Sequence, residues 1–445
     1  CFGIKIGNDH YGVYAPNGTV FEKGNGTLSV RFTGDQKFLS IAVLPNAEAL
    51  DDYYPYAYSK PVDTKVSWSY NEQTGRLSTQ YDVTTVNIKG EAENRTIQGF
   101  IPHHYRNYGK DYDRGTTVNF AFTNYEYLTP RGQMKMAIGN SFSFGYDFNG
   151  ILPFYPAPKK ESSPLYREDL MKSHIDMYKS VYADGTNAYW GGKKPFQMAM
   201  NMGFAYETGN MEAFETIKKN LREALIDWFT YTPGETARFF ARVDKFGALA
   251  MFQNEYAAIN GQDNHMEYGY WVSAAAMLAM YDEDFRSGYG EMIKLAIKNV
   301  ANWDRNDQKY TFLRLLSPWN GHSCAGSFGD GGGNGQESSS ESMNFWGGMY
   351  MTGVILEDKE LRDAAIFGWM TESRAVEEYY FDVERQNIDY TLYRREYDAG
   401  LGRDMTPAFN TNLKSEGIGW WTWFSGDPVW MFTIQWMPIS PALKY

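Results

Sequence analysis

Ionisable and aromatic side chains gather in the segment Gln262–Ala276, whose sequence is QDNHMEYGYWVSAAA. Three ionisable residues and two tyrosines make up the group: Asp263, His265, Glu267, Tyr268 and Tyr270. They precede a run of small and apolar residues, a pattern that predicts the start of a packed helix. At such a start Asp263 has two interpretations, either a capping residue that accepts backbone amide protons or a carboxylic acid available for proton transfer. With capping, His265 would be a buried structural histidine and the tyrosines would be core residues.

A second group of carboxylates stands in the segment Gly335–Gly348, GQESSSESMNFWGG. Glu337 and Glu341 are four residues apart, so on a helix they share one face, and like charges at this spacing destabilise a helix by roughly 0.2 to 0.5 kcal/mol. The alternative is a solvated Gly/Ser linker that happens to contain acids. The apolar and aromatic run Met343–Ile355 that follows favours a packed helix instead. The positive end of that helix would keep these glutamates ionised, which suits a base.

The two segments together predict a site that cleaves glycosidic bonds. Such cleavage requires one carboxylic acid to protonate the leaving oxygen and one carboxylate opposite it to act as base or nucleophile. Burial and a nearby carboxylate would raise the pKa of Asp263, whereas the helix dipole would keep Glu337 or Glu341 charged. Aromatic residues make up 17% of the chain, more than an ordinary core requires, and sugar rings stack on aromatic faces.

Motifs for other chemistries are weak or missing in the sequence. It contains neither a GxSxG nucleophile elbow, nor a Walker loop, nor a dinucleotide fingerprint. The 6 histidines form no His-x-x-x-His pair, and 2 cysteines cannot build a cysteine-rich metal site. Asp263, His265 and Glu267 offer oxygen and imidazole ligands at alternate positions, but helix capping explains that spacing more simply. We therefore expect no metal and no cofactor.

Composition argues against several classes of partner. The 445 residues include 54 acidic and 42 basic side chains, which gives a net charge of -12. A protein that binds nucleic acid or an anionic membrane needs a basic surface instead. The longest nearly apolar stretch, Trp271–Tyr281, is shorter than the roughly 20 residues that span a bilayer. We expect no nucleic-acid partner and no transmembrane segment.

The period of the apolar residues changes near residue 155. Before it, alternation such as that of Leu28, Val30 and Phe32 predicts short antiparallel strands, and the Thr74-Gly75 dipeptide has the composition of a turn between strands. The stretch Pro153–Pro164 contains four prolines, which interrupt helices and strands alike. We place a domain boundary there.

Beyond the boundary the period becomes helical. One apolar helix face is formed by Phe214, Ile217, Leu221, Leu225 and Trp228, and another by Met292, Leu295, Ala296, Val300 and Trp303. The long Gly-rich segment Ser317–Ser342 interrupts the helices, and such a segment inside a compact domain is more often functional than idle. The chain is thus predicted to hold a β-sandwich followed by a helical domain.

The segments DNHMEYGYWVSAAA and GQESSSES, at their spacing, resemble glycoside hydrolase family 81, the endo-β-1,3-glucanases that cut laminarin and fungal cell-wall glucan by inversion. Further short segments match the family in order: Ile101–Tyr105, Thr129–Lys135, Tyr189–Lys193, Gly321–Gly326 and Ile434–Pro441. The resemblance covers nearly the whole chain. Asn264 and Glu267 depart from it, because family members usually have histidine at both positions.

The resemblance implies an α+β multidomain fold, with an N-terminal antiparallel β-sandwich over residues 1–155 and a C-terminal (α/α)6 helical barrel over residues 156–445. It implies that Asp263 is the general acid, Glu337 the base that activates water, and Glu341 an acidic partner in the same cleft. Substrate-binding roles are expected for Tyr189, Trp190, His265, Glu267, Tyr268, Tyr270 and His322.

The expected partner is a β-1,3-glucan polysaccharide or oligosaccharide, and we expect a monomeric, secreted or cell-surface glycoside hydrolase. Two alternatives stay open at this point. One is a catalytically silent glucan-binding or cell-surface protein on the same scaffold, although such a protein would gain nothing from keeping buried carboxylates. The other is a barrel enzyme that acts on a different polysaccharide, against which the net charge of -12 argues mildly if that polysaccharide is acidic.

Overall fold

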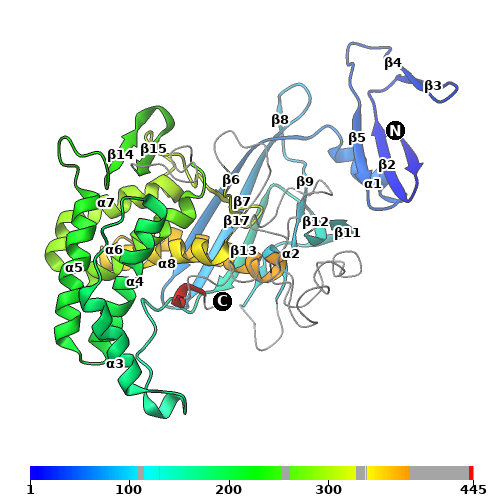
Figure 1. Cartoon of the computed structure of the whole chain (residues 1–445). Coiled ribbons are helices and arrows are strands. Elements are labelled where there is room, and N and C mark those ends of the chain that lie inside the picture. Colours follow the sequence, from blue (N-terminus) through cyan, green and yellow to red (C-terminus); the bar gives the residue numbers. More distant parts are fainter. Residues whose placement is uncertain are drawn as a thin grey trace. The chain divides into compact units, whose positions relative to one another are not determined.

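The structure, a computed structural model, describes residues 1–107, 115–129, 131–251, 261–326, 336, 338–380 and 440–443. The chain divides into two compact units, one made of Cys1–Ser69 and Ser78–Asp147 and the other of Tyr70–Leu77 and Phe148–Tyr445. Figure 1 shows strands in the first unit and mainly helices in the second. The predicted order of antiparallel sheets followed by helices is confirmed. The boundary after residue 155 and the closure of the helices into an (α/α)6 barrel stay predictions.

Antiparallel sheets build the first unit. One has the strand order β1-β2-β5, made of Phe2–Ile6, Asp9–Tyr14 and Ser40–Leu44. Another has the order β11-β12-β9, made of Phe122–Thr129, Gly132–Ile138 and Ile97–Phe100. A third has the order β10-β13-β7-β6, made of Thr117–Val118, Ser141–Asp147, Arg76–Val86 and Lys60–Asn71, with β8 (Ala92–Glu93) beside β7. The hairpin β3-β4 (Val20–Lys23, Leu28–Arg31) and the short helices α1 (Ala49–Tyr53) and α2 (Pro102–Tyr105) also belong to this unit.

Aromatic residues at alternate strand positions form the core of the first unit. The ring of Phe100 lies 5.0 Å from that of Phe142 and 5.3 Å from that of Phe144, two residues further along β13. All three side chains are buried. The period of two that predicted strands therefore also identifies the side chains that face inward.

Helices dominate the second unit. The longer ones are α3 (Glu168–Met177), α4 (Ala188–Glu207), α5 (Met211–Phe229), α6 (Asn264–Tyr281), α7 (Glu283–Ala301), α8 (Ser339–Ile355) and α9 (Lys359–Ala375). Two small hairpins, β14-β15 (Phe240–Val243, Ala248–Met251) and β16-β17 (Leu316–Ser317, His322–Ser323), lie between helices along the chain. Within the described ranges, no helix combines the length and the apolar character needed to cross a membrane.

The prediction of a buried apolar face holds for α5 but only in part for α7. On α5 all five predicted residues, from Phe214 to Trp228, are buried, as expected. On α7 the prediction is partly wrong, because Leu295 is 37% exposed and Trp303 follows the last helical residue, Ala301. The helix stops at Asn302, whose side-chain amide donates hydrogen bonds to two backbone carbonyls of the loop that follows. That loop interaction is invisible to apolar periodicity.

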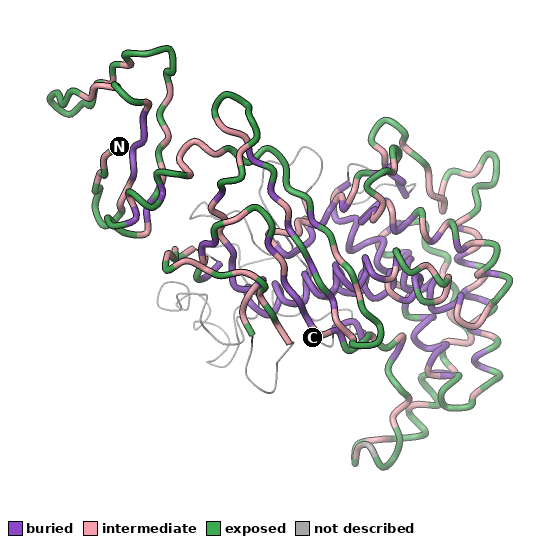
Figure 2. The backbone as a smooth tube through the Cα atoms, turned by 180° about the vertical axis from the view of Figure 1, so that it is seen from behind, coloured by how far each residue is buried: buried purple, intermediate pink, exposed green. Residues whose placement is uncertain are grey.

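Glycines let α6 and α8 approach each other closely. A Cβ atom at Gly348 of α8 would lie 2.6 Å from Ser273 Oγ and 2.8 Å from the Ser273 backbone nitrogen on α6. A Cβ atom at Gly269 of α6 would lie 3.1 Å from the backbone nitrogen of Phe345. The contacts advance in the same direction along both helices, so α6 and α8 run parallel and their first turns lie at the same end. Figure 2 shows the continuous buried stretches that run through this helical unit.

We predict that Gly348→Ala destabilises the protein by about 1 to 3 kcal/mol, because the added methyl group forces α6 and α8 apart. Gly288→Ala is the matched control, since Gly288 is an exposed position of α7 where a Cβ would meet nothing within 4 Å. In an exposed helix, alanine should stabilise by up to about 1 kcal/mol relative to glycine. Chemical denaturation of the two variants checks this, and equal stabilities would contradict the close packing of α6 against α8.

Candidate active site

Asp263 directly precedes α6 and adopts a left-handed backbone conformation, with φ of 54° and ψ of 9°. Its backbone carbonyl accepts hydrogen bonds from the amides of Met266 and Glu267, and its own amide donates to Ala325 O at 3.1 Å. Its side chain makes no capping hydrogen bond. The capping interpretation is therefore wrong for the carboxyl group, although the residue stands at the N-cap position. Left-handed backbone at a non-glycine residue is uncommon and is found preferentially at functional sites.

The side chain of Asp263 is buried. The residue is 9% exposed, its Oδ1 has no hydrogen-bond partner among the described residues, and Oδ2 lies 3.5 Å from Gln262 Nε2. Burial raises the pKa of Asp263 from 3.8 to about 7, the Gln262 amide opposes this, and the negative charge of Glu341 adds to it. A carboxyl with this pKa carries a proton in a large fraction of molecules near neutral pH, so it can donate one.

Glu341 lies in the first turn of α8 and is held by donors from two other helices. Its Oε1 accepts hydrogen bonds from Tyr270 Oη on α6 at 2.6 Å and from Tyr189 Oη on α4 at 2.8 Å. Lys193 Nζ lies 3.7 Å from the same oxygen and donates to Tyr189 Oη at 2.7 Å. Two hydrogen bonds and one ion pair from α4 and α6 therefore fix the position of this buried carboxylate.

An aromatic surface adjoins this cluster at the start of α4. The ring of Trp190 is 55% exposed and lies 5.1 Å from that of Tyr189. Lys193 Nζ lies 3.9 Å from the centre of the Tyr189 ring and 4.4 Å from that of Trp190. Asn187 fixes the start of α4 by accepting hydrogen bonds from the amides of Tyr189 and Trp190. The exposed indole thus directly follows Tyr189, which donates a hydrogen bond to Glu341.

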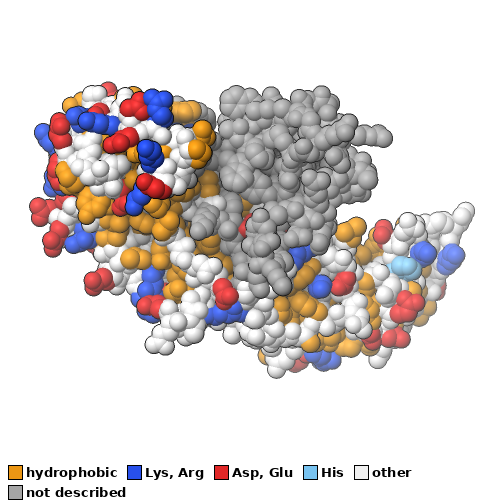
Figure 3. Space-filling view, turned by 90° about the horizontal axis from the view of Figure 1, so that it is seen from below, with side chains coloured by type: hydrophobic (Ala, Val, Ile, Leu, Met, Phe, Trp, Pro, Cys, Tyr) orange, Lys and Arg blue, Asp and Glu red, His pale blue; other side chains and the backbone are white. Residues whose placement is uncertain are grey.

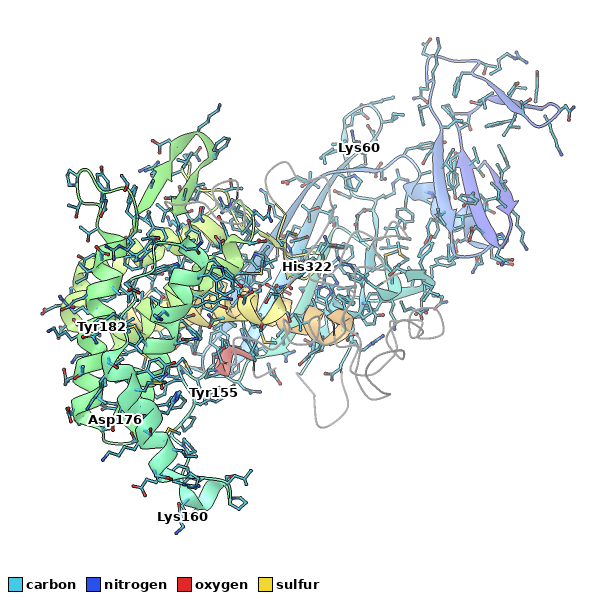
Figure 4. The ribbon with its side chains drawn as sticks, viewed as in Figure 1. Lys60, Tyr155, Lys160, Asp176, Tyr182 and His322 are labelled. Atoms are coloured by element: carbon cyan, nitrogen blue, oxygen red, sulfur yellow. The ribbon has the colours of Figure 1, made fainter. Side chains whose placement is uncertain are left out.

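The other predicted site residues have different environments. Tyr268 donates its hydroxyl to the backbone carbonyl of Leu249 rather than to a carboxylate. His265 is fully buried, and burial lowers its pKa to about 3, which keeps the ring neutral. His322, labelled in Figure 4, is buried on β17 with Nδ1 3.0 Å from the carbonyl oxygen of Ser323.

Glu267 is buried in the first turn of α6. Among the described residues, the charge of Glu341, which is distant in sequence, raises the pKa of Asp263. Glu337, the predicted base, lies outside the described residues.

Two residues of this region had no place in the predicted site. Lys193 lies four residues after Tyr189 in a helix, and that spacing puts both side chains on one face, so the pairing could have been found. Glu372 on α9 is fully buried and accepts hydrogen bonds from Ser323, Gln336 and Trp346. No local pattern distinguishes it from other glutamates in amphipathic helices. Over the described ranges, no group of three or more His, Cys, Asp or Glu residues has an arrangement that could hold a metal ion.

Comparison with known proteins places this geometry in context. Residues 169–445 match the family model of the glycosyl hydrolase family 81 C-terminal domain. A glucan endo-1,3-β-D-glucosidase of Acetivibrio thermocellus is 35% identical over 455 aligned residues, and one of Thermobifida fusca is 30% identical over 452. Each alignment covers 100% of this chain but only 55% of the relative, so the chain spans about half the length of these proteins.

A solved structure of similar fold is a mutant of a glycoside hydrolase family 81 protein from Clostridium thermocellum. The TM-score is 0.82 at 31% sequence identity, and the match covers 99% of this chain and 59% of that one. The family model alone accounts for more than half of the present chain. The chain therefore belongs to glycosyl hydrolase family 81.

Proposed function

We propose that the chain is an endo-acting glycoside hydrolase that cleaves β-1,3-glucan by an inverting acid/base mechanism. The observation that carries this proposal is the state of the Asp263 carboxyl. It is buried and makes no capping hydrogen bond, and its pKa is raised to about 7 beside the charge of Glu341. Two carboxyl groups kept in opposite protonation states are what glycosidic cleavage needs. The names of the relatives at 35% and 30% identity support β-1,3-glucan as the substrate.

In the proposed mechanism Asp263 protonates the glycosidic oxygen as the bond to the anomeric carbon breaks. Glu337 accepts a proton from the water that attacks the opposite face of the sugar, which inverts the configuration at that carbon. Glu341, held by Tyr270, Tyr189 and Lys193, supplies the negative charge that helps to keep Asp263 protonated until it reacts. In this mechanism Glu341 acts on the protonation of Asp263 and does not transfer a proton itself.

Substrate contacts are proposed for the aromatic surface beside the carboxylates. The exposed ring of Trp190 and the adjoining Tyr189 ring offer apolar faces on which glucose rings can stack. Roles in substrate binding remain predictions for His265, Glu267, Tyr268, Tyr270 and His322. A neutral glucan agrees with the surface in Figure 3, where acidic and basic side chains are interspersed over the described face in view.

The same proposal includes the architecture and setting expected of the family. The helices of the second unit would close into an (α/α)6 barrel, and the sheets of the first would form a β-sandwich. A polymeric glucan substrate is found in cell walls, so we propose a secreted or cell-surface location. We propose a monomer as the active form.

Incubation with laminarin tests the function directly. We expect new reducing ends, with the α-anomer as the first product detected by proton NMR before mutarotation. Asp263→Asn and Glu337→Gln should each lower kcat by roughly 10² to 10⁴ or more, because each change removes one proton-transfer group and keeps the shape.

Asp284→Asn is the matched control, since Asp284 is exposed in the first turn of α7 and its variant should keep wild-type turnover. Near-normal turnover in either site variant would remove that residue from the mechanism. Laminarin binding without any new reducing ends in the wild type would favour the silent glucan-binding protein. Initial release of the β-anomer would contradict inversion.

The pH dependence follows from the raised pKa of Asp263. The acid must be protonated to act, so kcat/KM should fall as the pH rises through about 7. The stability of the fold should depend on the protonation of the same carboxyl group. A pKa that is higher in the folded state than the unfolded value of 3.8 gives a contribution to stability that is fully present below pH 3.8 and is lost as the pH rises through about 7.

Asp263→Asn lacks this titration. Between pH 4 and pH 8 its free energy of unfolding should therefore rise relative to that of the wild type by a few kcal/mol, at about 1.36 kcal/mol per pKa unit. Denaturant unfolding at a series of pH values measures the difference. A constant difference across this range would mean that the pKa of Asp263 is the same in the folded and unfolded chain.

A further inference from the structure

Glu372 is a buried carboxylate that the proposed mechanism does not use. It lies on α9 with an exposure of 0% and accepts four hydrogen bonds. Oε1 accepts from the Ser323 amide at 3.1 Å and from Gln336 Nε2 at 2.8 Å. Oε2 accepts from Ser323 Oγ at 2.8 Å and from Trp346 Nε1 at 2.7 Å. Burying a carboxylate is costly unless its oxygens are satisfied, and here both of them are.

The donors belong to three segments that are separate in sequence, and each segment leads to one of the candidate carboxylates. Ser323 lies two residues before Ala325, whose carbonyl accepts the hydrogen bond from the backbone amide of Asp263 at 3.1 Å. Gln336 immediately precedes Glu337 in the chain. Trp346 lies on α8, five residues after Glu341.

We propose that Glu372 is a positioning residue for catalysis: it fixes to one common acceptor on α9 the loop that accepts the Asp263 amide, the residue before Glu337 and the helix that carries Glu341. The inference rests on the function proposed above. Charge-assisted hydrogen bonds are short and directional, so a shift of any one segment weakens a bond to the shared carboxylate. In this proposal Glu372 acts through Ser323, Gln336 and Trp346, its donors within the described part of the chain.

The surroundings of α9 support this role. Gly368, one helical turn before Glu372, is packed so closely against the Trp346 ring that an added Cβ would overlap the ring. The indole is therefore held by packing on its face and by the hydrogen bond from its N–H to Glu372. Ser323 donates to Glu372 through both its amide and its hydroxyl, so its backbone and its side chain are both fixed.

Glu372→Gln tests the proposal with little change in shape. The amide keeps one acceptor oxygen and places an NH2 group against donors that need an acceptor, so at least one of the three segments is released. We expect kcat on laminarin to fall roughly ten- to a hundredfold, as expected for groups displaced by a fraction of an ångström to an ångström. KM should stay within about twofold of the wild-type value, because the sugar-binding surface on α4 is untouched.

Asp363→Asn is the matched control, since Asp363 is another buried carboxylate of α9 that pairs with Lys359 and Arg362 instead. It should lose thermal stability and keep the wild-type kcat. An equal fall of kcat in both variants would show a general effect of destabilising α9 and would overturn the proposal. Unchanged kcat in Glu372→Gln would overturn it as well, while turnover by the wild type in the same assay keeps the proposed function intact.

A double-mutant cycle with Gln336→Leu distinguishes positioning from mere stability. If Glu372 acts through Gln336, the double variant should have a kcat no lower than that of the worse single variant. If the fold-losses of kcat in the two single variants multiply in the double variant, Glu372 does not act through Gln336. If Glu372→Gln fails to fold, Gln336→Leu alone tests the proposal. A reduced kcat at normal KM would support the positioning role of Glu372, and an unchanged kcat would contradict it. Absence of turnover in the wild type would instead overturn the proposed function.

Discussion

Burial of the Asp263 carboxyl next to the negative charge of Glu341 is the constraint on which the site depends. Burial alone favours the protonated acid, and the neighbouring charge adds to it, so that the pKa reaches about 7. A helix start would normally favour the ionised form by about 0.3 to 1 kcal/mol. Raising the pKa from 3.8 to about 7 corresponds to roughly 4 kcal/mol, so burial outweighs the dipole. The protein therefore keeps an acid at a place where a helix would stabilise its conjugate base.

The carboxylate of Glu341 is held in place by direct contacts. Tyr270 and Tyr189 each donate a hydrogen bond to the same carboxylate oxygen, and Lys193 lies 3.7 Å from it. The arrangement requires α4, α6 and α8 to meet at one end, which the glycine contacts between α6 and α8 make possible. Because the two helices run parallel, Asp263 before α6 and Glu341 in the first turn of α8 lie at the same end of the pair. The fold thus gives two neighbouring carboxyl groups unlike surroundings.

Local patterns in the sequence predicted the order of strands and helices, and they singled out Asp263, Glu341 and Tyr270, whereas Tyr189 was named only through the family resemblance. Asp263, Glu341 and Tyr270 each stand in a short segment whose polar groups contrast with an apolar helix. Local patterns failed where tertiary contacts decide. The left-handed backbone of Asp263 has no sequence signature. Glu372 is identified only by three donors brought together from Ser323, Gln336 and Trp346.

The most direct test of this account is a carbon-13 NMR titration of the Asp263 carboxyl, assigned by comparison with Asp263→Asn in protein labelled at aspartate Cγ. The account predicts a midpoint near pH 7 in the wild type. It predicts a lower midpoint in Glu341→Gln, because the like charge that raises the pKa is then gone. A wild-type midpoint near the ordinary value of 3.8 would contradict the account, since Asp263 would then be ionised at neutral pH and unable to serve as the acid.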